Sequence, residues 1–505
     1  MGLAGLLQKR DFLFGTSKNY VYFCIVKAEN LKEKTSTGLF WAFVNNGATQ
    51  LLNLAVGIFM ARLLSPADYG IVGVLALFGS IAMCLQTSGF SQALINLKHP
   101  TANDYNSVFW FNITVSIVLY LILFCCAPLI AHFFKQPCLV SVSRVLFLTL
   151  PVYAMGVASQ AYLVKNMMNR QIAYISIVSL VCSGMVGVAM AFGGHGYWAL
   201  VGQQLTSAVI TVVGRYFAIS WRPALTVDFK PVASMFRFSV NLLFTNMVNI
   251  INFNLSTFIF GRLLPIKTVG YYSQATKWNN LAEATIDGAI GQVSQTILVS
   301  VSNEQEREVR VFRKMLRFTA FLSFPALFGL SLIAREFILV TIGPEWLPSI
   351  PLLQILCIGG AFMPFYMLYQ TVAISAGRSD IYLWCQTGQV AIQLLLILLL
   401  FPYGIKAIVT GTAVLTIALL AVWQAIAHKL IGVRWREVAA DVLPFCLTAF
   451  GVMIITWLLT SPISLLPLLL VARIIVAALL YSAIMKLLHV DVMDECISFL
   501  FKKKR

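Results

Sequence analysis

The chain has 505 residues, of which 59% are hydrophobic and 11% are charged, and its net charge is +17. A soluble domain typically has roughly 25% charged residues, so this composition cannot supply a solvated surface and excludes a soluble globular protein. The basic residues lie in short segments between apolar runs and toward both ends, which is typical of membrane topology signals and excludes a nucleic-acid-binding surface.

Fourteen apolar runs are long enough to cross a membrane, because a spanning helix needs about 20 mostly apolar residues. These predicted spans lie near residues 39–61, 71–91, 107–131, 140–163, 173–192, 197–217, 238–261, 270–298, 316–334, 350–374, 383–401, 405–427, 442–460 and 465–488. An even number of spans leaves both termini on one side. The tails and loops on that side, with the span ends beside them, carry 27 of the 36 Lys and Arg residues. The positive-inside rule therefore predicts cytoplasmic N- and C-termini.

An internal repeat divides the chain. Arg62-Leu63-Leu64-Ser65-Pro66 with Gly70 recurs 200 positions later as Arg262-Leu263-Leu264-Pro265 with Gly270. Two further matches follow at an offset of 208: Gly196-x-x-Ala199-x-Val201 with Gly404-x-x-Ala407-x-Val409, and Arg170 and Tyr174 with Arg378 and Tyr382. Each copy contains six spans, an even number, so the copies have the same orientation and are related by an axis along the membrane normal. Such lobes are typical of alternating-access transporters; the alternative is that duplication only enlarged a helical bundle.

The predicted fold class is an all-α integral membrane protein of about 14 transmembrane helices, with two parallel six-helix lobes related by a pseudo-twofold axis and two further C-terminal helices. The expected divisions are a cytoplasmic tail over 1–37, an N-lobe over 38–222, a C-lobe over 223–302 and 303–430 with a basic cytoplasmic connector at 303–317, two extra spans over 431–490 and a basic cytoplasmic tail over 491–505. The N-terminal segment lacks a signal-peptide cleavage site. The ten scattered cysteines predict neither disulfides nor a metal site, and no cofactor is expected.

Several sequence motifs along residues 35–430 resemble one protein family. They are Gly38-Leu39-Phe40-Trp41, Ala61-Arg62-Leu63-Leu64-Ser65-Pro66-Ala67-Asp68-Tyr69-Gly70-Ile71-Val72-Gly73, Ser88-Gly89-Phe90-Ser91-Gln92-Ala93-Leu94-Ile95, Val108-Phe109-Trp110-Phe111-Asn112, Ala127-Pro128-Leu129-Ile130-Ala131, Gly196-Tyr197-Trp198-Ala199-Leu200-Val201 and Gly270-Tyr271-Tyr272. Together they are similar to the Wzx-type polysaccharide flippases, in the branch of lipopolysaccharide and colanic-acid exporters. The chain departs from the branch at Gln274, where the resemblance calls for Arg, and at Thr296-Ile297-Leu298, where it calls for a proline.

The resemblance implies a function and a location. A Wzx-type protein belongs to the superfamily that includes the MATE multidrug exporters and the lipid II flippase. It moves a polyprenyl-pyrophosphate-linked oligosaccharide, a repeat unit of O-antigen, capsule or exopolysaccharide, across the bacterial cytoplasmic (inner) membrane. Its expected partners are this lipid-linked oligosaccharide, membrane lipids and a polymerase of the same pathway. Coupling to protons or sodium ions is left open. No nucleic-acid partner is expected.

Amide side chains form a polar stripe on the first span of each lobe. Asn46, Gln50 and Asn53 share one helical face of the first span, and Asn246, Asn249 and Asn252 share a face of the seventh. Lipid disfavours such groups, so each stripe is predicted to face a hydrated cavity that binds substrate. The alternative is hydrogen bonding between helices without a ligand. Trp41, Trp110 and Trp278 are further candidates for contact with sugar.

Three cations are the main candidates for binding the pyrophosphate. Arg62 and Arg262 could each pair with phosphate oxygens through two hydrogen bonds. The alternative is that both arginines extend toward lipid headgroups at span ends. Lys277, in the eighth span, is an equal candidate, and Arg473 a weaker one.

Glu283 and Asp287 lie four residues apart on one face of the eighth span. A charged carboxylate is costly at membrane depth, so the pair is a candidate for ion coupling. In the alternative, Asp287 reaches the cytoplasmic interface and Glu283 accepts a hydrogen bond from an amide of the seventh span.

Two other function classes fit less well. A MATE-like cation-coupled drug antiporter calls for an acidic residue in the first span, and the chain has none between Glu33 and Asp68. An enzyme of the same pathway calls for a long extracytoplasmic loop with charged catalytic residues, and every predicted loop on that side is short. The protein is therefore expected to perform no bond chemistry.

Overall fold

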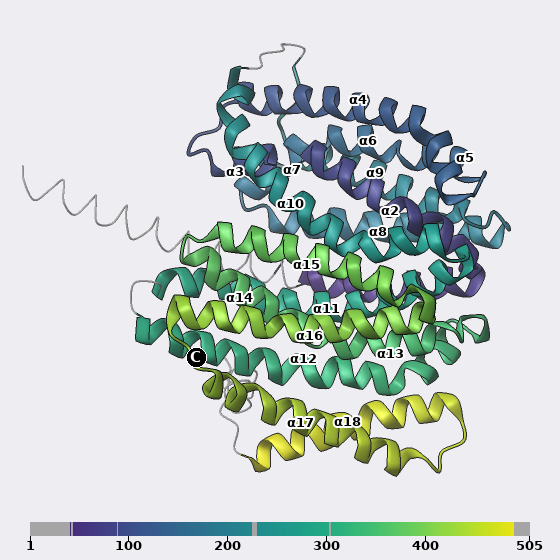
Figure 1. Cartoon of the computed structure of the whole chain (residues 1–505). Helices are drawn as coiled ribbons and strands as arrows, with labels where there is room; N and C mark the ends of the chain where they lie inside the picture. The colour runs from purple at the N-terminus through teal and green to yellow at the C-terminus, as the bar shows by residue number, and fades with distance from the viewer. Residues whose placement is uncertain (1–40, 42–43, 88, 225–229, 302–304, 489–505) are drawn as a thin grey trace, which may run out of the picture.

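A computed structural model describes residues 41, 44–87, 89–224, 230–301 and 305–488. The predicted tails over 1–37 and 491–505 lie outside the described residues. The elements of the described residues are all helices, and most of them run nearly parallel or antiparallel to one another (Figure 1).

The N-lobe starts with a helix over residues 44–63. It continues with α2 (Pro66–Thr87), α3 (Phe90–Asn96), α4 (Ala102–Phe134), α5 (Leu139–Leu146), α6 (Thr149–Met155), α7 (Val157–Lys165), α8 (Asn169–Phe192) and α9 (Trp198–Ala218). The fourth predicted span is broken into α5, α6 and α7, and the chain bends by 44° between Leu139–Met155 and Val157–Lys165.

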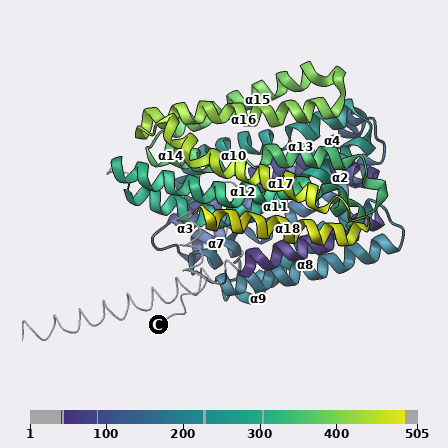
Figure 2. The same ribbon diagram turned by 90° about the horizontal axis from the view of Figure 1, so that it is seen from below.

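The C-lobe repeats this order. It contains α10 (Lys230–Leu263), α11 (Ile266–Val301), α12 (Gln305–Thr341), the short η1 (Pro344–Trp346), α13 (Ser349–Gly360), α14 (Met363–Ser375), α15 (Ser379–Leu400), the short η2 (Phe401–Tyr403) and α16 (Gly404–Ile431). The tenth predicted span is broken into α13 and α14, as the fourth is broken in the N-lobe. In the view from below, α8 and α9 lie along one side of the bundle and α15 and α16 along the opposite side (Figure 2). The predicted order of fourteen spans is therefore confirmed.

Two C-terminal helices, α17 (Trp435–Thr460) and α18 (Leu466–Leu487), pack on α12 at the outside of the C-lobe (Figure 1). From Gln305 onward, the predicted connector over 303–317 forms the first turns of α12. Two of its arginines bind α17: Arg313 Nε lies 2.6 Å from Asp441 Oδ2, and Arg317 Nε lies 3.2 Å from Asp441 Oδ1. The basic stretch thus docks the extra helices.

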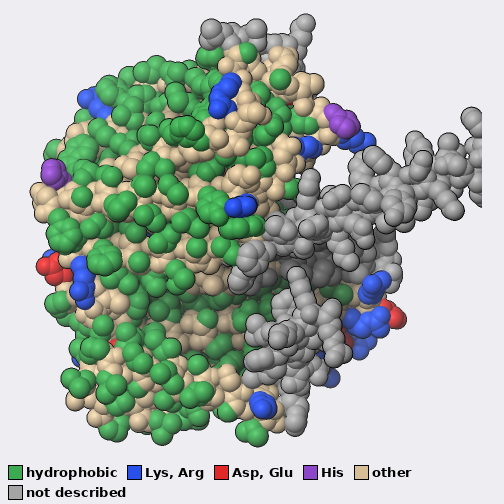
Figure 3. Space-filling model, turned by 180° about the vertical axis from the view of Figure 1, so that it is seen from behind, with side chains coloured by type: hydrophobic (Ala, Val, Ile, Leu, Met, Phe, Trp, Pro, Cys, Tyr) green, Lys and Arg blue, Asp and Glu red, His purple; other side chains and the backbone are tan. Residues whose placement is uncertain are grey.

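The surface is that of a membrane protein. Figure 3 shows a face dominated by hydrophobic side chains on which charged side chains are sparse. Among the described residues, eight helical segments are long and apolar enough to cross a membrane, and a ninth crossing is the bent segment of α5 to α7. One of the eight contains both α15 and α16. Four long helices are absent from this apolar group: the helix over 44–63, α9, α10 and α11. The helix over 44–63 and α10 carry the predicted polar stripes, and α11 carries the predicted acidic pair.

Local sequence explains why α2 starts within the first repeated motif, at Pro66. Pro66 occupies the first turn of α2, where its missing N–H costs nothing. Ser65 Oγ accepts a hydrogen bond from the Asp68 backbone N–H at 3.4 Å, and Asp68 Oδ2 accepts one from the Ser65 backbone N–H at 2.9 Å. This reciprocal capping box fixes the start of α2.

Candidate functional site

The two repeated motifs meet at one end of the bundle, which we call the motif end. A Cβ built on Gly70 of α2 would overlap the Ile266 carbonyl oxygen of α11, and a Cβ built on Gly270 of α11 would overlap the Pro66 carbonyl oxygen of α2. Gly70 and Gly270 are 200 positions apart, and so are Pro66 and Ile266. The contact is therefore reciprocal about the pseudo-twofold axis, and only glycine allows the two backbones to approach so closely.

Other contacts close the same end. Arg62 Nη2 donates to the Val340 carbonyl oxygen at 2.6 Å, and its Nε donates to the Thr341 carbonyl oxygen. Both acceptors belong to the last turn of α12, where unpaired carbonyl groups favour a cation. Trp346, 1% exposed, donates from Nε1 to the Ala61 carbonyl oxygen at 2.9 Å. The N-lobe and C-lobe are thus joined at the motif end by hydrogen bonds as well as by packing.

The two candidate arginines lie at this end and line neither of the cavities described below. Arg62 is exposed and holds the end of α12. Arg262 is also exposed, and its guanidinium carbon lies 5.4 Å from the centre of the Phe133 ring. These positions agree with the alternative in which both arginines stabilise span ends.

Lys277 lies deeper between the lobes. It is eleven residues into α11, or about 16 Å from the start of the helix at 1.5 Å per residue. Its Nζ lies 5.7 Å from the ring centres of both Tyr69 and Trp278, and it approaches Gly57 of the helix over 44–63. The side chain is nevertheless exposed, and among the described residues it forms no ion pair. Of the three candidates, Lys277 is the cation that a ligand between the lobes would meet.

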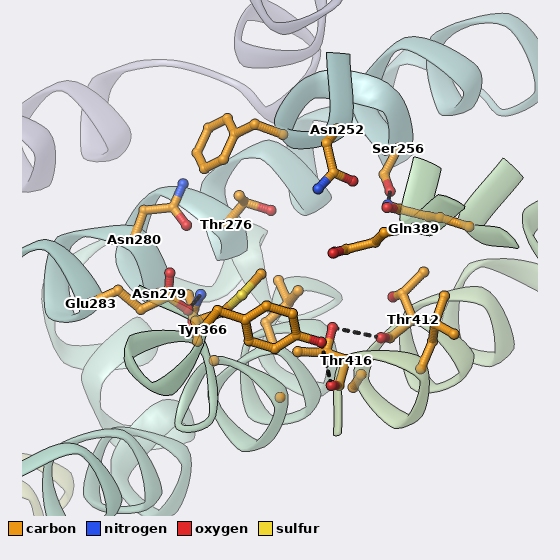
Figure 4. Close-up of a pocket in the computed structure, with 18 of the residues that line it drawn as sticks. Asn252, Ser256, Thr276, Asn279, Asn280, Glu283, Tyr366, Gln389, Thr412 and Thr416 are labelled. Atoms are coloured by element: carbon orange, nitrogen blue, oxygen red, sulfur yellow. Dashed lines mark hydrogen bonds between the residues drawn. The ribbon is translucent and has the colours of Figure 1, made fainter. Parts of the chain in front are cut away.

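A polar cavity of about 320 Å³ lies within the C-lobe, among α10, α11, α13, α14, α15 and α16. We call it the amide cavity, because eight of its lining residues carry carboxamides: Asn249, Asn252, Asn279, Asn280, Gln370, Gln386, Gln389 and Gln393. Figure 4 shows several of these side chains arranged around the cavity with Thr276, Tyr366, Thr412 and Thr416. Two predicted residues, Asn249 and Asn252, therefore line a cavity, and five other helices complete its lining.

Hydrogen bonds fix part of this lining. Tyr382 Oη and Gln386 Nε2 both donate to Asn249 Oδ1 at 2.9 Å, and Gln393 Nε2 donates to Ser256 Oγ at 3.1 Å. These bonds connect α15 to α10. Sequence reasoning missed the α15 glutamines, although their spacing of three and four residues in an apolar run was a visible signal of a polar helical face.

The two carboxylates of the acidic pair of α11 have different surroundings. Glu283 lines the amide cavity and accepts a hydrogen bond from Asn279 Nδ2 at 2.8 Å. The donor is thus an amide of the same helix rather than one of the seventh span. A Cβ at Gly360 would overlap the Glu283 carboxylate, so this glycine makes room for it. Asp287 Oδ1 is buried and has no hydrogen-bond partner among the described residues.

The amides of the first span lie elsewhere. Asn46 and Gln50 line a second cavity of about 470 Å³, between the helix over 44–63, α11 and α12, which we call the lateral cavity. Its other lining side chains are mostly apolar and include Trp278. Asn53 is exposed, and Asn246 is half-buried; neither lines either cavity. Two residues of each predicted stripe thus line a cavity, and the two stripes meet different cavities.

Three other candidates, Trp41, Trp110 and Arg473, contact other residues of the protein. Trp110 donates from Nε1 to the Ala224 carbonyl oxygen at 2.8 Å, and the Arg170 guanidinium carbon lies 5.7 Å from the centre of the Trp41 ring. Arg473 of α18 pairs with Glu336 of α12, with Nη1 and Oε2 2.7 Å apart and side chains only 9% and 3% exposed. Arg473 is therefore neutralised within the protein. Within the described ranges, no group of three or more His, Cys, Asp and Glu side chains could hold a metal ion.

Comparison with known proteins places this architecture in a family. Residues 59–351 match the model of a family described as polysaccharide biosynthesis protein. The succinoglycan biosynthesis transport protein ExoT of Rhizobium meliloti (strain 1021) is 24% identical over 412 residues, covering 80% of each chain. The lipopolysaccharide biosynthesis protein WzxC of Escherichia coli (strain K12) is 26% identical over 354 residues, covering 70% of this chain and 72% of that protein.

Solved structures show the same fold. An inward closed conformation of the lipid II flippase MurJ superposes with a TM-score of 0.69 at 13% identity, covering 89% of this chain and 99% of that one. An inward-facing multidrug resistance MATE family transporter of the MOP superfamily gives a TM-score of 0.60 at 14% identity, covering 76% and 95%. The chain is a multi-pass membrane protein with the two-lobed MOP fold, and it belongs to the polysaccharide biosynthesis protein family.

Proposed function

We propose that the protein translocates a polyprenyl-pyrophosphate-linked oligosaccharide repeat unit across the cytoplasmic membrane by alternating access. Two features together carry the proposal. The lobes are closed against each other at the motif end, and Lys277 and the amide cavity still offer polar groups to a ligand at membrane depth. Relatives whose names refer to transport and biosynthesis of succinoglycan and lipopolysaccharide support the substrate class.

The orientation follows from charge. Cytoplasmic termini place the basic tails and the start of α12 inside and the motif end outside. The structure then represents a state closed toward the outside. Transport requires the lobes to separate at the motif end and to come together at the other end, which is the rigid-body rocking expected of repeats with a site between them.

The proposal is tested in a strain that lacks the gene. Lipid-linked repeat units should accumulate on the inner leaflet while soluble sugar nucleotides stay at normal levels, and the wild-type gene should restore surface polymer. Normal surface polymer and an unchanged pool of lipid-linked units in the deletion strain would contradict the proposed function.

Lys277 provides the cationic contact for the pyrophosphate in this proposal. We expect Lys277→Gln to lower polymer export roughly ten- to a hundredfold, because a charge-assisted hydrogen bond contributes about 1.5–3 kcal/mol and glutamine keeps a polar, unbranched stem but carries no charge. Lys406, in the first turn of α16 outside both cavities, offers the matched control Lys406→Gln. Export should be measured as surface polymer per unit of membrane-inserted protein. Equal export by both variants would remove Lys277 from the site.

Glu283 and Asp287 are the proposed coupling residues. In inverted vesicles with an imposed proton or sodium gradient, we expect Glu283→Gln and Asp287→Asn to lose the response to the gradient while uncoupled exchange continues. The reason is that an amide keeps the shape of a carboxyl group and can still accept a hydrogen bond, but it does not take up a proton and lacks the negative charge that attracts sodium. A full response in both variants would show that the two residues are structural.

A further inference from the structure

We propose that the amide cavity binds an uncharged sugar ring of the transported head group, and that it sets which saccharide is accepted. This inference rests on the proposed function and deepens it, because it assigns the saccharide and the pyrophosphate to different faces of α11. The cavity volume of about 320 Å³ is at the low end of the range of roughly 300–1,000 Å³ for small-ligand sites, so it fits part of an oligosaccharide.

The lining matches the chemistry of sugar hydroxyl groups. A carboxamide both donates and accepts hydrogen bonds, as a hydroxyl group does, so eight carboxamides from four helices can surround a ring with complementary partners. Several of them have little access to solvent: Asn279 is 5% exposed, Gln386 7% and Gln389 8%. Figure 4 shows Gln389 extending into the cavity from the side opposite Asn279.

Unsatisfied polar atoms point to a ligand. Asn252 Oδ1, Asn279 Oδ1 and Thr276 Oγ1 are buried and have no hydrogen-bond partner among the described residues. All three belong to residues that line the cavity. Buried polar atoms without partners are costly and uncommon, so three of them around one cavity indicate that a polar ligand completes their hydrogen bonds.

The charge of the lining favours a neutral sugar over a phosphate or an acidic sugar. Among the residues that line the cavity, Glu283 is the one charged side chain, and no lysine or arginine is present. A phosphate or an acidic sugar would meet a carboxylate and no cation. Lys277 lies six residues earlier on α11, which places it about 9 Å along the axis and roughly 120° around the helix from Glu283. The pyrophosphate therefore belongs between the lobes and the neutral ring within the C-lobe.

The occupancy of the cavity can be measured by photo-crosslinking in intact cells that carry a tritium-labelled precursor sugar. Benzoylphenylalanine would replace Met363, which lines the amide cavity, Leu51, which lines the lateral cavity, or Met185 of α8, which is 60% exposed and lines neither. We expect labelled saccharide to be captured at 363 at a level several-fold above 185. Capture at 51 without capture at 363 would overturn the inference while leaving the proposed function intact. Absence of capture at all three positions, together with an unchanged lipid-linked pool in the deletion strain, would overturn both.

A matched pair of substitutions tests the hydrogen-bond chemistry. Gln389→Leu should lower export roughly three- to tenfold, as expected for the loss of one net hydrogen bond, and Asn252→Leu combined with it should lower export further. Gln204→Leu changes an exposed amide of α9 and should leave export unchanged. If Gln389→Leu exports at the level of Gln204→Leu, the amides do not recognise the saccharide.

Discussion

Replacing Gly270 with valine is expected to abolish polymer export, with a fall of at least about a hundredfold relative to wild type. A Cβ at this position would overlap the Pro66 carbonyl oxygen, which is backbone and cannot rotate away. The two lobes then cannot close at the motif end, because packed interfaces move between discrete arrangements rather than deforming continuously. A protein that cannot close on one side cannot complete the transport cycle.

The control and the readout follow from the same geometry. Gly451 lies in α17, where a built Cβ meets nothing within 4 Å, so Gly451→Val should export normally. In a cysteine-depleted background, Ser273→Cys at the lobe contact should react faster with an impermeant maleimide when Gly270 is replaced. Gly270→Ala provides the smaller change if valine lowers the protein level, because its Cβ alone produces the overlap. Normal export by Gly270→Val at a normal protein level would contradict the closed state described for the motif end.

Removing one partner of the buried ion pair between α12 and α18 is expected to produce the largest loss of stability. Glu336→Ala should lower the free energy of unfolding by about 3–5 kcal/mol, because it leaves Arg473 buried without its counter-ion. Two neutral hydrogen bonds would remain to Arg473, from its Nε to Thr460 Oγ1 at 3.3 Å and from its Nη1 to the Leu332 carbonyl oxygen at 3.2 Å. Thermal denaturation of the detergent-purified protein, followed by tryptophan fluorescence, measures the change.

The double variant Glu336→Leu with Arg473→Met separates charge from packing. It should recover most of the lost stability, because replacing both partners of a buried pair with apolar residues of similar volume is often nearly neutral. If the single and double variants unfold at the same temperature, the pair contributes through shape alone. That result would contradict an electrostatic role for the pair in docking α18.

Much of the fold was predictable from the sequence because membrane helices leave a strong signal. Runs of about 20 apolar residues indicate the spans directly, and the 200-residue offset between Gly70 and Gly270 indicates the duplication. The contact between the two copies was not predictable, because an offset shows that two segments are equivalent and not that they touch. The fourth and tenth spans are broken into shorter helices, which hydropathy cannot resolve because it averages over the break.

The candidate site was predictable only in part. Polarity within a span singled out Asn46, Gln50, Asn249 and Asn252, which line cavities, but periodicity on one helix cannot show which cavity a face meets. The partner of Arg473 was not predictable, since Glu336 is 137 residues away in the chain. Gln389 lies in α15, which is otherwise among the apolar segments, so the overall polarity of the span does not single it out.

Reconstitution in proteoliposomes tests the central claim most directly. The lipid-linked repeat unit is extracted from the deletion strain and placed in vesicles with the purified protein, and the fraction open to an external glycan-modifying reagent is followed over time. With wild-type protein, nearly all of the lipid-linked saccharide should become accessible, while Gly270→Val vesicles should stay at the half accessible in protein-free vesicles. If wild-type vesicles also stay at the protein-free level, the protein does not translocate this lipid.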